Sequence, residues 1–143
     1  MEAQTQSFKT IETGNFNIQV YNASENSFGV ASVIVSGKTD AILIDAQFTL
    51  ADAEIVAQEI KQSGKKLTSI YVSHGDPDFY FGLEVFKKHF PEVTVYASPA
   101  TVEHIKATAQ KKLGIWGERL GKNITSNVVL PQVLKGNSID LEG

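Results

Sequence analysis

The sequence contains no cysteine, so it can form neither disulfide bonds nor thiolate metal sites, and it offers no thiolate nucleophile. Histidine is scarce as well, because the only imidazoles are those of His74, His89 and His104. Any transition metal would therefore have to be held by these histidines together with carboxylates.

Long apolar runs are also missing, since none approaches the ~20 residues that a membrane crossing needs. The polar start, residues 1–6, lacks the basic and then apolar pattern of a signal peptide. We therefore expect a soluble protein with no membrane partner. Cytoplasm and periplasm both stay open, because such a start also fits the mature end of an exported protein with an added methionine.

Basic residues are too few and too scattered to form a stripe. The formal net charge is −3, with 13 Lys and Arg against 16 Asp and Glu. Nucleic acid is therefore not expected as a partner. The length of 143 residues and the 42% hydrophobic content indicate one globular domain over residues 1–143.

Apolar patterning predicts strands in the first third of the chain. Residues 16–21 alternate apolar and polar side chains, as in a strand with one dry face. Residues 30–35 and 41–44 are denser apolar runs, and residues 36–39 between them have the composition of a turn. This combination predicts a hairpin of buried strands.

Farther along the chain, helical spacing alternates with short strands, which predicts an α/β protein. The expected elements are a helix over 49–63, a strand over 67–72, a helix over 79–90, a strand over 93–96, a helix that follows the capping pair Ser98-Pro99, and short β pieces at 128–130 and 139–141.

Three potential metal ligands, His74, Asp76 and Asp78, occupy alternate positions directly after the 67–72 strand. Pro77 fixes its own φ and disfavours helical backbone at Asp76, so the chain is held extended there. In extended backbone, side chains at i and i+2 leave on the same side. His74 and Asp76 can therefore converge, with Asp78 close behind. An imidazole and two carboxylates suit zinc, or manganese or iron.

A purely structural interpretation of these residues stays open. Asp78 precedes the helix expected from Phe79, where a carboxylate accepts backbone N–H bonds and complements the helix dipole. Asp76 before a proline is ordinary turn chemistry. Asp45, directly after the 41–44 strand, can cap the turn that follows.

The order of these features resembles the N-terminal half of metallo-β-lactamase-fold hydrolases. The resemblance rests on the loop itself, on Asp45 after an early strand, on Ser73 before the loop, and on Gly82 in the helix after it. It implies the first half of an αββα sandwich, with a mixed sheet and covering helices, and a domain that is the N-terminal portion of a longer one. It also implies that Asp45 supports the site from the floor of the cleft.

In that family the loop reads His-x-His-x-Asp-His and binds one or two metals, usually zinc, that activate water. His74 and Asp78 match this pattern, whereas Asp76 stands at the second histidine and Phe79 at the fourth. The resemblance therefore assigns His74 and Asp76 to a first metal site. Asp78, which is also the catalytic candidate, belongs to a second site that has lost its imidazole. The motif is degenerate, and a single metal or a carboxylate-rich site is the expectation.

The leading hypothesis is a metal-dependent hydrolase whose water is activated by a metal held in part by His74, Asp76 and Asp78, with a small-molecule substrate of unknown class. The alternative is a non-catalytic module of the same fold with a decayed metal site, which acts by binding. No histidine follows His104, whereas the family places further ligands later in the fold. Zinc is thus expected in the complete hydrolase and weakly or not at all in this chain, which we expect to be inactive alone.

Dense apolar strands also predict a partner. Residues 30–35 and 41–44 are apolar on both faces, as in strands covered on two sides. Helices can cover one side, and in the family the second half covers the other. We therefore expect self-association or a missing C-terminal half. Tyr80 could support the site by walling a substrate pocket or could simply pack, while His89 and His104 are expected to be solvated residues on helices.

Overall fold

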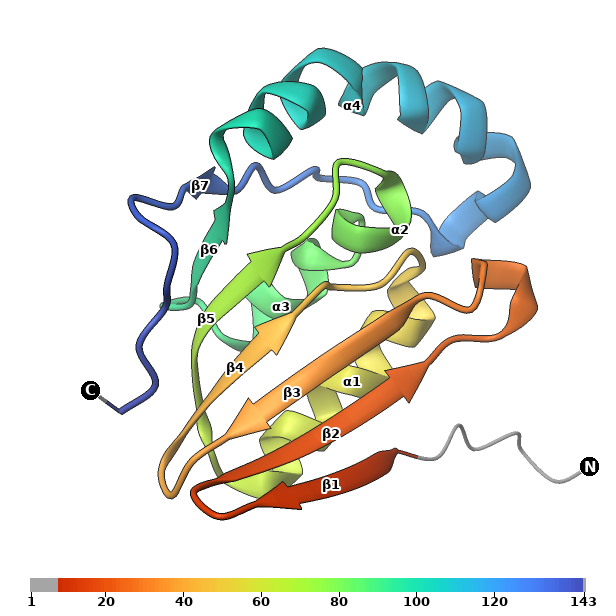
Figure 1. The fold of residues 1–143 in the computed structure, drawn as a ribbon. Coiled ribbons are helices and arrows are strands. Elements are labelled where there is room, and N and C mark those ends of the chain that lie inside the picture. The colour runs from red at the N-terminus through yellow and green to blue at the C-terminus, as the bar shows by residue number, and fades with distance from the viewer. Residues whose placement is uncertain (1–7, 143) are drawn as a thin grey trace, which may run out of the picture.

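The computed structural model describes residues 8–142. Its framework is a single sheet of seven strands, which follow one another across the sheet in the order of the sequence (Figure 1). The strands are β1 (Lys9–Thr13), β2 (Phe16–Asn22), β3 (Ala31–Ser36), β4 (Asp40–Ile44), β5 (Lys66–Val72), β6 (Thr94–Ala97) and β7 (Gln132–Val133).

The helices are placed by the connections between the strands. Thr49 caps the first of them by accepting a hydrogen bond from the Asp52 N–H, and Gly64 ends it with φ 75°. The helices are α1 (Leu50–Ser63), α2 (Pro77–Tyr80), α3 (Leu83–His89) and α4 (Pro99–Leu120), with 3-10 turns η1 (Glu25–Ser27) and η2 (Gly121–Asn123).

The sheet is mixed, as predicted. Strands β1 to β4 pair antiparallel, and β4 to β7 pair parallel. Helical crossovers join the parallel strands, which is how parallel neighbours are usually connected. The carboxyl ends of β4, β5 and β6 therefore meet at one edge of the sheet, and the predicted ligand loop leaves from this edge.

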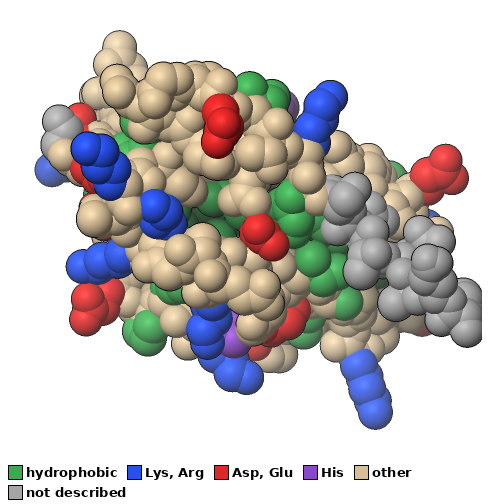
Figure 2. Space-filling view, turned by 90° about the horizontal axis from the view of Figure 1, so that it is seen from below, with side chains coloured by type: hydrophobic (Ala, Val, Ile, Leu, Met, Phe, Trp, Pro, Cys, Tyr) green, Lys and Arg blue, Asp and Glu red, His purple; other side chains and the backbone are tan. Residues whose placement is uncertain are grey.

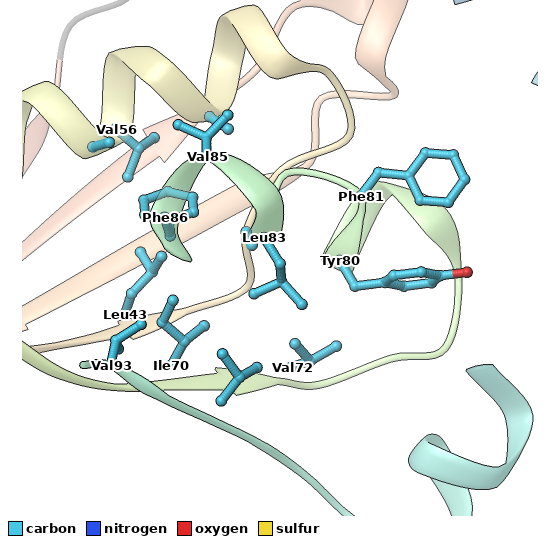
Figure 3. Close-up of a cluster of buried hydrophobic side chains, with 14 of the residues drawn as sticks. Leu43, Val56, Ile70, Val72, Tyr80, Phe81, Leu83, Val85, Phe86 and Val93 are labelled. Carbon is cyan, nitrogen blue, oxygen red and sulfur yellow. The ribbon is translucent and has the colours of Figure 1, made fainter. Parts of the chain in front are cut away.

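The main hydrophobic core lies between the sheet and the helices α1 and α3, which run side by side behind it in Figure 1. Figure 3 shows Leu83 and Phe86 of α3 facing the sheet residues Leu43 and Ile70, all four of them buried. Val56 of α1 belongs to the same core. These contacts fix the helices that flank the ligand loop.

The opposite face of the sheet is only partly covered. Residues 134–141 pass over it and leave a hollow of about 810 Å³ between themselves and the strands. Val35 and Ile44 line this hollow and are half-buried, and Phe16 at its margin is 43% exposed. The face of β3 and β4 toward the helices is therefore packed and the other face is partly open; β4 is apolar on both faces, whereas the packed face of β3 also carries the buried Ser32 and Ser36.

The prediction of one continuous helix over 79–90 is wrong. The helix is divided into α2 and α3 at Phe81 and Gly82. The reason is that backbone groups there bond to the loop after β4: the Phe79 carbonyl accepts from the Ala46 N–H at 2.9 Å, and the Gly82 N–H donates to the Gln47 carbonyl at 2.9 Å. A side chain at position 82 would also overlap Ala46 and Ala53. Tertiary contacts override the helical pattern here.

The predicted strands at 128–130 and 139–141 are also wrong, because the only pairing of this region within residues 8–142 is that of β7 with β6. Pro131, which has no N–H to donate, precedes β7.

Strand β1 was not expected, because only Ile11 among its exposed side chains marks it as a strand. Helix α4 runs past Gly114 and Gly117 to Leu120, whose side chain packs on the core.

The surface carries mixed charge. On the face shown in Figure 2, Lys and Arg side chains alternate with Asp and Glu, and hydrophobic side chains appear between them. None of the helices within residues 8–142 combines the length and the apolarity that a bilayer crossing requires.

Candidate functional site

The predicted ligand loop lies at the carboxyl edge of the parallel strands, between the end of β5 and the start of α2. Asp76 occupies the N-cap position of α2 with extended backbone, φ −84° and ψ 148°, and Pro77 follows at the first helical position. The Asp76 side chain makes no capping bond. Its carboxylate therefore stays available at the exposed surface of the loop.

Asp45 anchors the beginning of this loop. Its carboxylate accepts hydrogen bonds from the Ser73 N–H at 2.7 Å and from the Ser73 hydroxyl at 2.6 Å. The side chain is buried, and the backbone adopts φ 67°, a left-handed conformation that Asp tolerates better than most residues. Asp45 thus holds Ser73, the residue that precedes His74.

The backbone of Asp45 is tied into the sheet as well. Its N–H donates to the Tyr71 carbonyl at 2.8 Å, and its own carbonyl accepts from the buried Ser32 hydroxyl at 2.8 Å. Burial raises the pKa of the Asp45 carboxyl above its ordinary value, and the two hydrogen bonds from Ser73 oppose this increase by lowering the pKa. The charge of His74 also lowers this pKa, whereas the charge of Asp78 raises it. Asp45, His74 and Asp78 are therefore within electrostatic reach of one another.

Asp78 lies in the first turn of α2, one residue inside the helix rather than just before it. It is half-buried, and this burial is the main cause of its raised pKa. The neighbouring Asp76 charge raises the pKa further, whereas His74 and Lys112 lower it. A carboxyl with this desolvation and these neighbours has the electrostatics of a site residue, although ion-pair networks can produce similar shifts.

His74 and Phe79 are in direct contact. The His74 side chain is exposed, and its ring centroid lies 4.7 Å from that of Phe79, with the planes inclined by 34°. Phe79 is partly buried and packs against the hydrophobic core. Phe79, which stands at the fourth ligand position of the motif, thus packs on His74, which stands at the first.

Tyr80 is not a wall of an open pocket, because its side chain is fully buried. Its ring packs against Phe81, and Figure 3 shows its hydroxyl oxygen directed away from the Leu83 and Phe86 cluster. That hydroxyl has no hydrogen-bond partner among residues 8–142. Burial, and after it the charge of Asp76, raises the pKa of Tyr80 to about 12. Tyr80 is therefore part of the buried interior at the end of α2.

Two residues of α4 border the same loop, and sequence reasoning missed them. The ring of His104 lies against Gly75, where a Cβ would overlap the imidazole. Lys112, two turns farther along the helix, acts on Asp78 by its charge. Helix α4 follows β6, the parallel neighbour of β5, and this arrangement brings its first turns near the loop. His89 was also placed wrongly as a solvated residue, because its Nε2 lies 2.7 Å from Glu54 Oε2.

The loop alone does not amount to a complete metal site. No group of three His, Asp or Glu side chains within the described range 8–142 is arranged to hold a metal ion. The chemistry of His74, Asp76 and Asp78 suits zinc, but structural sites use four ligands and catalytic ones at least three from the protein. The residues present therefore fit part of a zinc site and no more.

Solved structures with the same fold are metallo-β-lactamases. The mono-zinc form of FIM-1 from Pseudomonas aeruginosa is 14% identical, with a TM-score of 0.61, and the match covers 93% of this chain and 52% of that one. DIM-1 exposed to ceftazidime is 18% identical, with a TM-score of 0.57 and coverage of 95% and 56%. The enzyme from Hirschia baltica is 16% identical, with a TM-score of 0.60 and coverage of 95% and 57%.

This chain thus spans about half the length of those structures. A comparison with curated proteins found no match. The family model of the metallo-beta-lactamase superfamily matches residues 26–141, which includes Asp45, the ligand loop and α4. With the order of its elements, its mixed sheet and this match over most of its length, the chain belongs to the metallo-beta-lactamase superfamily, whose members are generally metal-dependent hydrolases.

Proposed function

We propose that this chain carries the first part of the active site of a metal-dependent hydrolase, in which His74, Asp76 and Asp78 are its share of the metal ligands. The anchoring of the loop is the observation that carries the proposal. Asp45, a buried carboxylate, is committed to both donors of Ser73, the residue before His74. Burying a carboxylate is costly, and such an arrangement is expected where a loop needs a fixed position.

Each side chain of the loop has a separate task in this proposal. His74 offers an imidazole nitrogen, and Asp76 and Asp78 offer carboxylate oxygens. Zinc in such a site lowers the pKa of bound water and polarises a substrate carbonyl or phosphoryl oxygen. Asp78 is the catalytic candidate, because its half-buried carboxylate is within reach of the charges of both other groups and could orient a water molecule by a hydrogen bond.

The substitution of a ligand by Phe79 favours one metal over two. A phenyl ring has no lone pair to offer, and here it covers the His74 ring. The remaining ligands of the proposed site belong to the part of the fold that this chain does not span. We therefore propose activity for the complete hydrolase and none for this chain alone.

The test is the zinc content of the protein expressed from its complete gene, measured by mass spectrometry after gel filtration. We expect about one zinc per molecule, and hydrolysis within a panel of lactams, lactones, thioesters and phosphoesters. His74→Ala should lose the metal, whereas the control His89→Ala, on α3 beside Glu54, should keep it. Equal zinc in both variants would exclude His74 as a ligand.

A non-catalytic module is the second candidate, and two observations favour it. Phe79 occupies a ligand position, and no three ligands converge within residues 8–142. In that case the complete protein contains no stoichiometric zinc and hydrolyses nothing in the panel. The same metal measurement therefore separates the two functions.

A further inference from the structure

The ligand loop contacts α4 at Gly75, a residue without a side chain. A Cβ built on Gly75 would overlap Cδ2 of His104, and it would lie 3.0 Å from Cγ and 3.2 Å from Cβ of the same residue. The contacts involve the ring and its attachment, so a small rotation of the ring does not relieve all of them. The imidazole of His104 thus occupies the space that a side chain at position 75 would need.

His104 is held in this position by a rigid helix. The Ser98 side chain caps α4 by accepting from the Thr101 N–H, and Val102 and Ile105, on either side of His104, are buried. The carbonyl of His104 itself accepts a hydrogen bond from the Thr108 hydroxyl at 2.8 Å. The ring is exposed to solvent on its outer side, but its base cannot move independently of the core.

The centre of the loop has few other restraints. Its start is fixed by Asp45 through Ser73, and its end by the Phe79 N–H, which donates to the Asp76 carbonyl at 3.0 Å. Within residues 8–142, no backbone hydrogen bond is formed by the N–H groups of His74 or Gly75. The contact with His104 falls on the part of the loop that hydrogen bonds leave free.

We propose that His104 is a positioning residue for the ligand loop: by packing on Gly75 it sets the direction in which the side chains of His74 and Asp76 leave the backbone. In this proposal His104 acts by its contact with the loop backbone at Gly75. The functional meaning of this role rests on the proposed metal site. The packing of His104 on Gly75 is independent of that proposal.

The first test needs no metal. In the metal-free protein, His104→Ala should lower the backbone NMR order parameters of Gly75 and Asp76 to below about 0.6 and shift the His74 ring resonances, because the loop centre loses its support. The matched control is Glu103→Ala, the exposed neighbour of His104 on α4, whose carboxylate pairs with Lys106 of the same helix. Equal behaviour of the two variants would overturn the proposal.

A second pair of variants separates positioning from general destabilisation. His104→Phe keeps a ring of similar shape, so it should restore a high order parameter at Gly75. Gly75→Ala should disturb the loop in the native background and be tolerated together with His104→Gly, which frees the space. If His104→Phe behaves like His104→Ala, or if the double variant is no better than Gly75→Ala alone, packing is not the mechanism.

The last measurement connects the contact to the proposed function. Removing residues that orient metal ligands commonly lowers affinity by about 10-fold or more. In the protein from the complete gene, His104→Ala should therefore weaken zinc binding by about 10-fold, whereas Glu103→Ala should leave it unchanged. If zinc binds to neither the native protein nor its variants, the proposed function fails, while the NMR order parameters of the metal-free protein still decide the role of His104. If zinc binds the native protein and His104→Ala equally, the positioning role is wrong and the proposed function stands.

Discussion

The rings of His74 and Phe79 pack on each other with their centroids 4.7 Å apart. One face of the first candidate ligand is therefore covered by hydrocarbon, at the place where the family has another imidazole. Phe79 cannot bind a metal, but it restricts the orientations open to the His74 ring. The change at position 79 thus replaces ligation by packing.

Replacing Phe79 by Ala should lower the free energy of unfolding by about 2–3 kcal/mol, somewhat less than for a completely buried aromatic ring. Urea unfolding measures this change. Phe16→Ala is the control, because that ring is 43% exposed, and its cost should stay below about 1 kcal/mol. A cost at position 79 as small as that at position 16 would mean that the ring does not pack on the core.

Asp45→Ala should loosen the start of the loop. The substitution leaves the N–H and hydroxyl of Ser73 without their acceptor, which should cost about 1–3 kcal/mol of stability. Amide exchange at Ser73 should rise by about 10-fold or more. Asp40→Ala, at the other end of β4, serves as control. Unchanged exchange at Ser73 would show that the two bonds do not hold the loop.

The carboxylate of Glu84 should make stability depend on pH in the acid range. Burial raises its pKa, but bonds from Thr125, Ser126 and Asn127 together lower it below the ordinary value of 4.5. A lowered pKa means that the folded state binds the proton less tightly than the unfolded chain. The stabilisation is therefore complete above pH 4.5 and is lost as pH falls through the lowered pKa. Glu84→Gln should flatten the stability profile below pH 4.5 in acid titrations followed by circular dichroism, and an unchanged slope would contradict this assignment.

The 143-residue chain alone should bind zinc weakly or not at all. Three first-half ligands that do not converge cannot close a site, so little resists a chelator. Isothermal titration calorimetry measures this directly. Tight binding of one zinc per chain would prove the prediction wrong and would place a complete site within these residues.

The partly open face of the sheet leads to a prediction about association. In the chain alone, Val35 and its apolar neighbours around the hollow should drive self-association, since soluble proteins rarely expose large apolar areas. Light scattering coupled to size exclusion gives the mass. Val35→Lys should shift the population toward monomer, whereas Ile55→Lys, at an exposed position of α1, should not. A native chain that is monomeric at high concentration would disprove the prediction.

The sequence predicted the central part of the fold because its signals are local and strong there. Dense apolar residues in β3 and β4, and helical spacing with clear caps in α1, leave little ambiguity. The edge strand β1 escaped prediction because its side chains are exposed and carry no alternation. The division between α2 and α3 escaped because it depends on hydrogen bonds to residues more than thirty positions away.

Only those parts of the candidate site that are defined by neighbouring residues in the sequence could be predicted. The alternation of His74, Asp76 and Asp78 and the support from Asp45 could be inferred, since they follow from the motif and from the end of a strand. His104 could not, because a histidine among charged residues of a helix looks like any solvated side chain. Its position depends on where α4 crosses the loop, which is a property of the tertiary structure.

The cross-links between Ala46 and Phe79 and between Gln47 and Gly82 have a consequence for how this fold can change. They join the loop that contains Asp45 to the segment that follows Asp78, with no room at Gly82 for any side chain. An insertion between Ala46 and Gln47, or between Phe79 and Gly82, would have to break at least one of these bonds before it could be accommodated. These two short segments should therefore tolerate a change of residue type, except at Gly82, more readily than a change of length.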